Sequence, residues 1–170
     1  MSVGRRVGFS VKVEGMGSLL AELSTYVDEV EKLQVEMLTA IAEQGEQIAR
    51  RELRKAGISP GGTLGQSITS EYDEQRKLGV VKTDCPYAGF VEFGTGIVGK
   101  GSPHPEAGTH GWKYDINEHG EKGWVYYDRK RGKFFWTKGR PSVPFMYLTA
   151  QELKQTAPKI AAEVLRNHRH

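Results

Sequence analysis

The sequence predicts an α+β fold, in which a small antiparallel sheet is packed by one long N-terminal helix and a C-terminal helix. Apolar residues recur at three- and four-residue steps over 18–56 and again over 144–166, which is the spacing of amphipathic helices. Between these segments, two pairs of short β-prone runs are each joined by a polar turn, which is typical of hairpins.

Length and composition limit the class of protein. The 170 residues fit one domain, which we take to span 1–170. With 38% hydrophobic and 26% charged residues, the chain can bury a core, and we expect no membrane association. The single cysteine, Cys85, cannot close a disulfide within the chain, and we interpret it as a buried small side chain. The N-terminus shows no secretory signal, so we expect the protein to fold in a cytosol.

The N-terminal elements are a strand and a helix. Apolar and polar residues alternate over 7–14, as in a strand with one buried face. The helix over 18–56 has a candidate break near 24–25, where Thr25 is a residue type that caps helices. A helix of about 30 residues spans roughly 45 Å, so we expect part of it to find a second partner surface. Gly45 costs about 1 kcal/mol relative to alanine, which indicates a close approach by another backbone.

The middle of the chain predicts a hairpin over 66–83, with a polar run between its two strands. Residues 86–93 are apolar and few, and we favour a short helix there. Residues 94–123 are rich in Gly, Pro and His and have no periodicity, which predicts a long loop. We expect this loop to be mobile in the free protein and to contact a neighbouring molecule.

The last third of the chain predicts a second hairpin over 124–137, with Gly132 in its turn. We expect the aromatic side of this hairpin to face the core and its turn to be solvated. The helix over 144–166 contains Pro158, which predicts a kink or a restart.

Two motifs suggest an enzyme, but neither has the context it needs. Gly94 to Gly99 matches GxGxxG, yet a nucleotide site requires a helix directly afterwards, and two prolines follow at 103 and 105. We predict a glycine-rich loop and no cofactor. His104, His110 and His119 lack the close pairing of zinc ligands, so we interpret them as solvated and predict no metal. A metal-dependent hydrolase that uses these histidines is the least favoured function.

A basic run raises a different alternative. The segment 129–140, which we call the basic run, has six basic residues, no acidic residue and three aromatic residues between them. The basic residues are Arg129, Lys130, Arg131, Lys133, Lys138 and Arg140. Basic groups attract phosphate, and exposed aromatic rings can stack on single-stranded bases. A small DNA-binding module that uses this hairpin is therefore an alternative function, although the net charge of +3 is modest.

Two segments resemble a family of small tail-completion, or neck, proteins of long-tailed bacteriophages. In that family a Tyr-Ala-x-x-Val-Glu-Phe-Gly-Thr signature precedes a Pro-Phe-Leu-x-x-Ala signature at the head of the last helix. The corresponding segments here are Tyr-Ala-Gly-Phe-Val-Glu-Phe-Gly-Thr at 87–95 and Pro-Ser-Val-Pro-Phe-Met-Tyr-Leu-Thr-Ala at 141–150. The long first helix and the Leu-Gly-Gln-Ser-Ile segment at 64–68 agree with the family's order.

The resemblance implies a structural virion protein and not an enzyme. The chain would be made in the cytoplasm of a bacterial host and would join the virion at the neck, as a ring around the DNA path. Six-fold symmetry is the leading expectation. The implied partners are other copies of the chain, the head-closure proteins and the tail-terminator or tail-tube proteins, with non-specific DNA contact in the lumen as a further option. The residues that we assign to structure or interface are Tyr87, Glu92, Phe93, Gly94, Thr95, Pro144 and Phe145.

Elementary chemistry suggests roles for these residues. Gly94 permits a sharp turn where a side chain would clash, and Glu92 is placed to accept hydrogen bonds from the amides of that turn. Phe145 follows Pro144 and would open the last helix as an inward anchor. Glu92 as a fold-stabilising carboxylate and Glu92 as a partner contact both stay open. The basic run would face either DNA or an acidic patch on the next ring, and we favour the protein partner.

Overall fold

The structure is a computed structural model that describes residues 16–115, 122–128 and 131–168. The predicted strand over 7–14 lies outside these residues. The elements, in chain order, are α1 (Met16–Lys55), α2 (Thr63–Ser67), β1 (Ile68–Asp73), β2 (Leu78–Thr83), α3 (Ala88–Phe93), α4 (Gly96–Gly101), β3 (Trp124–Asp128), β4 (Lys133–Thr137), β5 (Gly139–Arg140) and α5 (Phe145–His168). The predicted α+β class is confirmed.

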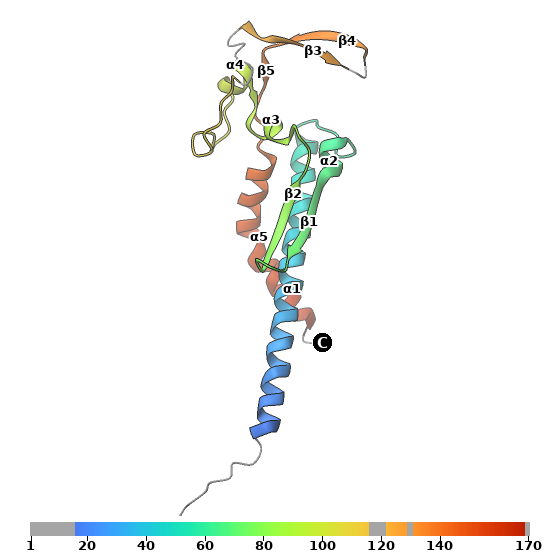
Figure 1. Ribbon diagram of the computed structural model, residues 1–170, viewed down its shortest axis with the longest axis vertical. Helices are drawn as coiled ribbons and strands as arrows, with labels where there is room; N and C mark the ends of the chain where they lie inside the picture. Colours follow the sequence, from blue (N-terminus) through green and yellow to red (C-terminus); the bar gives the residue numbers. More distant parts are fainter. Residues whose placement is uncertain (1–15, 116–121, 129–130, 169–170) are drawn as a thin grey trace, which may run out of the picture.

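The two long helices form the axis of the molecule. They pack side by side and run in opposite directions, and the first half of α1 extends well beyond the end of α5 (Figure 1). The expected break near 24–25 is wrong, because α1 is continuous over 40 residues. The Thr25 hydroxyl donates to the carbonyl of Ala21, 3.0 Å away, so it is satisfied inside the helix and caps nothing. Helix α5 likewise continues through Pro158, without a restart.

The hairpin of β1 and β2 lies along α1 (Figure 1). Its antiparallel register pairs Ile68 with Thr83 and Asp73 with Leu78, which confirms the predicted hairpin. The first two residues of the predicted range belong instead to the short helix α2. A Cβ on Gly45 would lie 2.7 Å from Val81 Cγ2 and 2.9 Å from Leu153 Cδ1. Two side chains, and not a backbone as expected, therefore crowd this glycine.

The hydrophobic core gathers where the end of α1 meets α2, β1, α3 and the start of α5. The buried residues of the core cluster are Ala49, Leu53, Leu64, Ile68, Cys85, Ala88, Val91 and Phe145.

Among the described residues, no helix is long and apolar enough to span a bilayer.

The segment between the two hairpins is more ordered than the sequence predicts. Residues 86–93 contain the favoured short helix, α3. The predicted loop over 94–123 is not all loop, because Gly96–Gly101 forms helix α4 within it. Two isolated bridges, Thr95 with Arg140 and Gly96 with Gly139, join this segment to β5. These contacts supply the backbone partners that a bare glycine-rich loop would lack.

The hairpin of β3 and β4 has the predicted antiparallel pairing, from Trp124 with Thr137 to Asp128 with Lys133. It forms a second sheet, separate from β1 and β2, where the sequence suggested one small sheet. The hairpin stands away from the helical body at the top of Figure 1, beyond β5. The expectation that its aromatic side faces the core is wrong. Within the described part of the chain, the core cluster includes no residue of this hairpin, and Phe134 and Trp136 are 73% and 58% exposed.

Candidate functional site

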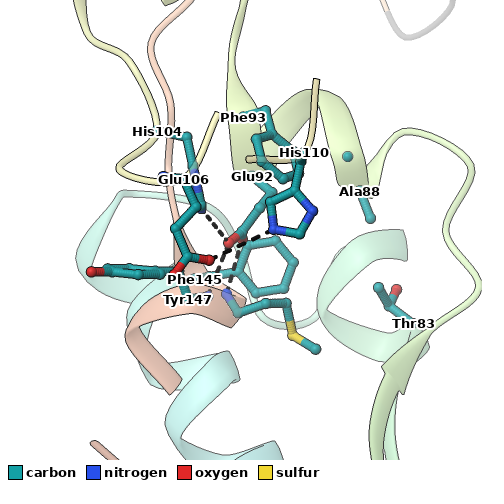
Figure 2. A pocket seen from close by; sticks show the side chains of 11 residues that line it. Thr83, Ala88, Glu92, Phe93, His104, Glu106, His110, Phe145 and Tyr147 are labelled. Atoms are coloured by element: carbon teal, nitrogen blue, oxygen red, sulfur yellow. Dashed lines mark hydrogen bonds and ion pairs between the residues drawn. The ribbon is translucent and has the colours of Figure 1, made fainter. Parts of the chain in front are cut away.

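The Glu92 carboxylate holds the start of α5. Its Oε2 accepts the backbone N–H of Met146 at 2.9 Å, and its Oε1 accepts that of Tyr147 at 2.9 Å (Figure 2). The first amides of a helix have no partner within the helix, and a negative charge there interacts favourably with the helix dipole. Glu92 is 7% exposed, so these hydrogen bonds form in a largely dry environment.

The local sequence explains why a distant carboxylate takes this role. Helix α5 begins at Phe145, and Pro144 before it has no side-chain acceptor that could cap the first turn. Two further bonds fix α3 against the same segment: the Ser142 hydroxyl donates to the carbonyl of Glu92 at 2.6 Å, and the N–H of Val143 donates to the carbonyl of Val91 at 2.9 Å. The expectation that the Glu92 carboxylate binds the turn after Phe93 is therefore corrected to the start of α5.

His104 completes the environment of the carboxylate. Its Nδ1 accepts the N–H of Glu106 at 3.0 Å, so the ring proton lies on Nε2, which donates to Glu92 Oε1 at 3.1 Å. At 4% exposed, His104 is buried, and its interpretation as a solvated loop histidine is wrong. The sequence gives no spacing signal for this pair, because the two residues meet only through the path of the loop.

Stacked rings hold this loop on α3. The ring of Phe93 lies 4.3 Å from that of His104 and 4.8 Å from that of Trp112, centroid to centroid. Trp112 Nε1 also donates to the carbonyl of Gly94 at 3.0 Å. Ala107, between the two aromatic partners, is buried. The described part of the 94–123 loop is thus packed against the body, and its mobility in the free protein stays a prediction.

Gly94 makes the turn that brings these pieces together. Its φ of +78° is in the left-handed region, and a Cβ would lie 2.7 Å from the N of Ser142. The expected steric reason for glycine is confirmed. Thr95, which follows, is 7% exposed and bridges to Arg140. Phe145, at 1% exposed, is the inward anchor that the sequence predicts.

A cavity of about 310 Å³ lies beside the Glu92–His104 pair (Figure 2). Phe145 and Ala88 contribute apolar walls, and His110 and Glu106 also line it. The side chain of His110 is 55% exposed, and its Nε2 lies 3.6 Å from Glu106 Oε2. The cavity is thus bordered by a buried histidine–carboxylate hydrogen bond and by an exposed histidine–carboxylate contact.

The arrangement is suited to holding elements together. Each carboxylate oxygen of Glu92 and each ring nitrogen of His104 already has a partner within the chain. These bonds join α3, the loop that carries His104 and the first turn of α5 at one carboxylate. Among the described residues, no group of three or more His, Cys, Asp and Glu side chains is placed to bind a metal ion.

The basic run does not form one patch in the described residues. Arg129 and Lys130 lie outside them. Arg131 packs over the Phe135 ring at 5.4 Å and has Asp128 as an ion-pair partner, with 3.8 Å between Nε and Oδ2. Lys133 is exposed on β4. Lys138 lies over Trp136, 5.5 Å from the ring centroid.

Arg140 differs from the rest of the run. It is half-buried in β5, and its Nε has no hydrogen-bond partner within the described part of the chain. Burial lowers the pKa of its guanidinium, and the nearby Tyr87 partly offsets that effect. Tyr87 precedes α3 and is 42% exposed. Arg140 therefore belongs to the packed junction and not to the solvated hairpin.

Sequence reasoning identified Glu92, Gly94 and Phe145 but missed two of their partners, His104 and Ser142. The sequence contains one indication that the start of the last helix needs such a partner. Because a helix that follows Pro144 cannot be capped by that side chain, its first amides need an acceptor from elsewhere.

Comparisons of the chain with protein-family models, with curated proteins and with solved structures found no match.

Proposed function

We propose that this chain is a structural protein of the head–tail junction of a long-tailed bacteriophage, which assembles as a ring that joins or closes the tail tube at the head around the DNA path. The observation that carries the proposal is the β3–β4 hairpin, which stands away from the body (Figure 1). Four of its aromatic side chains are exposed, those of Tyr126, Tyr127, Phe134 and Trp136. Large exposed apolar surfaces mark sites of protein association. The resemblance of residues 87–95 and 141–150 to the neck-protein signatures supports the phage context.

The Glu92 junction fits this role as a scaffold. It fixes α3 and the Gly94 turn on the start of α5, and the bridges of Thr95 and Gly96 then fix β5, from which the hairpin projects. The signature residues thus set the direction of a projecting arm. Partners in the proposed ring are other copies of the chain, a head-closure protein on one side and a tail-terminator or tail-tube protein on the other.

The test is a phage that lacks this chain. We expect full heads and complete tails to accumulate without joining, and the purified chain to restore joining when it is added to the mixture. A variant with Leu78→Ser, an exposed side chain on β2, should restore joining as well as the unchanged chain does. Normal joining without the chain, or virions that do not contain it, would refute the proposal.

A DNA-binding module is the second candidate, because Phe134 and Trp136 are exposed beside Lys133 and Lys138. Such a surface offers stacking platforms next to positive charge. The monomeric chain would then bind single-stranded DNA with an affinity that falls steeply with salt, and Phe134→Ala with Trp136→Ala would weaken binding at every salt concentration. Absence of salt-dependent binding removes this candidate.

A further inference from the structure

A seven-residue repeat runs along the first half of α1. With Leu20 as position a, the a and d positions are apolar over three heptads with one exception, and we call them the seam; they are Leu20, Leu23, Val27, Val30, Gln34, Met37 and Ile41. A straight α-helix has 3.6 residues per turn and drifts by about 20° per heptad from such a repeat. A repeat that holds over three heptads is therefore typical of a helix that packs on other helices.

The first part of the seam is uncovered within the described part of the chain, where α1 extends beyond the end of α5 (Figure 1). Five side chains on the seam or beside it are more than half exposed; they are Leu20, Leu23, Tyr26, Val27 and Val30, at 60%, 54%, 71%, 58% and 58%. Further along, Val30, Gln34 and Met37 line a groove of about 490 Å³ that Ala161 of α5 borders. The free seam, residues 20–34, is thus continuous with the interface between α1 and α5.

The charged side chains of this stretch lie away from the seam. Four carboxylates occupy b and c positions, on the other side of the helix; they are Glu22, Asp28, Glu29 and Glu36. Lys32 is at an f position, and only Glu31, at an e position, stands beside the seam. A partner with charges at the centre of its surface would find no counter-charge there. The seam therefore requires an uncharged, apolar partner, and the seam of another copy is such a surface.

Gln34 selects another copy among apolar partners. It is exposed at an a position and lines the groove together with apolar side chains. A wholly apolar partner would bury the Gln34 amide without a hydrogen bond, which is unfavourable. The Gln34 amide of another copy offers both a donor and an acceptor. A single polar a position of this kind fixes register, because the amides meet only when the helices are aligned.

The two possible helix directions differ in what they cover. An antiparallel pair that matched Gln34 with Gln34 would place the free seam against residues 34–48 of the other copy, and Ile48 in that stretch is buried in its own core at 1% exposed. A parallel pair places free seam against free seam. It also brings Tyr26 at g beside Glu31 at e of the neighbour, five residues later, where the phenol O–H can donate to the carboxylate.

The exposed area favours more than two copies. At about 100 Å² of apolar surface for a fully exposed side chain, the five exposed residues of each copy would bury about 600 Å² in a pair. A stable interface buries about 1,200 Å² or more. Apolar residues at the g positions, Tyr26 and Leu33, widen the face beyond a strict a/d seam, so one helix can contact two neighbours.

We propose that residues 20–34 of α1 form a parallel, in-register bundle with the same residues of at least two further copies of this chain, with the Gln34 amides hydrogen-bonded to one another inside it. The inference goes beyond the proposed function and does not depend on it, because the bundle forms from the purified chain alone. Parallel copies in register are related by rotation about one axis, which is also the symmetry of a ring.

The first test measures association of the full chain by sedimentation equilibrium. The unchanged chain should form trimers or larger species reversibly as its concentration rises through the micromolar range. Leu23→Ser with Val27→Ser should weaken association about tenfold or more. Glu22→Ser with Glu29→Ser puts the same number of serines on the other side of the helix and should leave association unchanged. All four positions are exposed, so the circular dichroism of the monomer should not change.

Gln34 gives a test that a merely sticky surface would fail. Gln34→Leu should strengthen association and broaden the range of oligomer sizes, because a polar a position lowers stability but fixes the arrangement. Gln34→Glu is nearly isosteric and should weaken association at neutral pH, where like charges would meet inside the bundle. If both variants associate as the unchanged chain does, the Gln34 amides do not meet and the proposal is overturned.

Cross-linking determines the direction of the helices. A short bis-maleimide should join Leu20→Cys chains to one another, because parallel copies in register bring position 20 next to itself. The unchanged chain, whose single thiol on Cys85 is buried, is the control for background reaction. Cross-linking in a mixture of Leu20→Cys and Gln34→Cys chains, with none between Leu20→Cys chains, would show antiparallel packing and overturn the proposal.

Two further results would also overturn it. An unchanged chain that stays monomeric over the whole concentration range would show that other copies do not cover the seam. Association that the Leu23→Ser and Val27→Ser pair does not weaken would show that copies meet through a different surface.

Discussion

The carboxylate of Glu92 and the backbone N–H of Tyr147 form a 2.9 Å hydrogen bond across 55 residues of chain. This bond couples the short helix α3 to the first turn of α5, and the neighbouring bond to Met146 repeats the coupling. The Gly94 turn follows α3 directly, and the bridges of Thr95 and Gly96 attach β5, from which the hairpin projects, to the same junction. The two signature segments are thus two halves of one junction.

Loss of the Glu92 carboxylate should destabilise the protein. Glu92→Ala leaves the amides of Met146 and Tyr147 and the Nε2–H of His104 without their acceptor in a buried site, so we expect a loss of about 3 kcal/mol in the free energy of unfolding. Glu92→Gln keeps one acceptor oxygen and should lose about 2 kcal/mol. Urea unfolding measures both, with Glu43→Ala on the exposed face of α1 as the control. A loss below about 0.5 kcal/mol for Glu92→Ala would contradict the junction.

Gly94 should be sensitive to any side chain, whereas Gly57 should not. Both have positive φ, at +78° and +74°, but a Cβ on Gly57 meets nothing within 4 Å and one on Gly94 lies 2.7 Å from Ser142 N. Gly57→Ala therefore has only the conformational cost of about 1 kcal/mol, and Gly94→Ala should cost about 2 to 4 kcal/mol. The comparison needs only two melting or urea curves. Equal costs would show that the approach of Ser142 does not constrain the turn.

Gly45 should couple to Val81. Gly45→Ala improves helix propensity by about 1 kcal/mol, but the new methyl group would overlap the side chains of Val81 and Leu153, and overpacking costs about 1 to 3 kcal/mol. We expect a net loss of about 1 kcal/mol. In the background of Val81→Ala the same substitution should cost less, because only the side chain of Leu153, 2.9 Å from the new methyl group, then has to shift. A double-mutant cycle measures the coupling, and strict additivity would contradict the packing.

Acid should weaken the protein partly through Glu52. The hydrogen bond from Lys55 Nζ at 2.8 Å, followed by the one from Arg51, holds the pKa of Glu52 below its ordinary value of 4.5 despite the opposing effect of burial. A lowered pKa in the folded state means that the stabilisation is complete above the unfolded pKa and is lost as pH falls through the folded one. The unchanged chain should therefore lose more stability than Glu52→Gln between about pH 5 and pH 3. Parallel pH profiles would contradict this role for the ion pair.

The long periodic elements were predictable from the sequence for a physical reason. The apolar spacing over 18–56 and 144–166 is that of two amphipathic helices, and both helices formed, although Leu20, Leu23, Val27 and Val30 at the start of α1 are exposed. The hairpins were predictable because polar turns separate β-prone runs. Gly94 and Phe145 were predictable because a positive φ and an apolar anchor depend on local geometry.

What the sequence could not give was the long-range pairing. Nothing in the spacing of Glu92 and His104 shows that one loop brings them together, and both residue types also occur in solvated positions. The exposure of the aromatic hairpin was missed for a related reason. Aromatic β-strands usually cover a core, and only the tertiary path through β5 shows that this one stands outside it.

The most direct test of the account is a cryo-electron microscopy map of the neck of the assembled particle. We expect several copies of this chain in a cyclic ring, six in the leading expectation, with the β3–β4 hairpin of each copy in contact with a neighbouring subunit. A single isolated copy, or a ring whose hairpins project into the lumen and touch no neighbouring subunit, would contradict it.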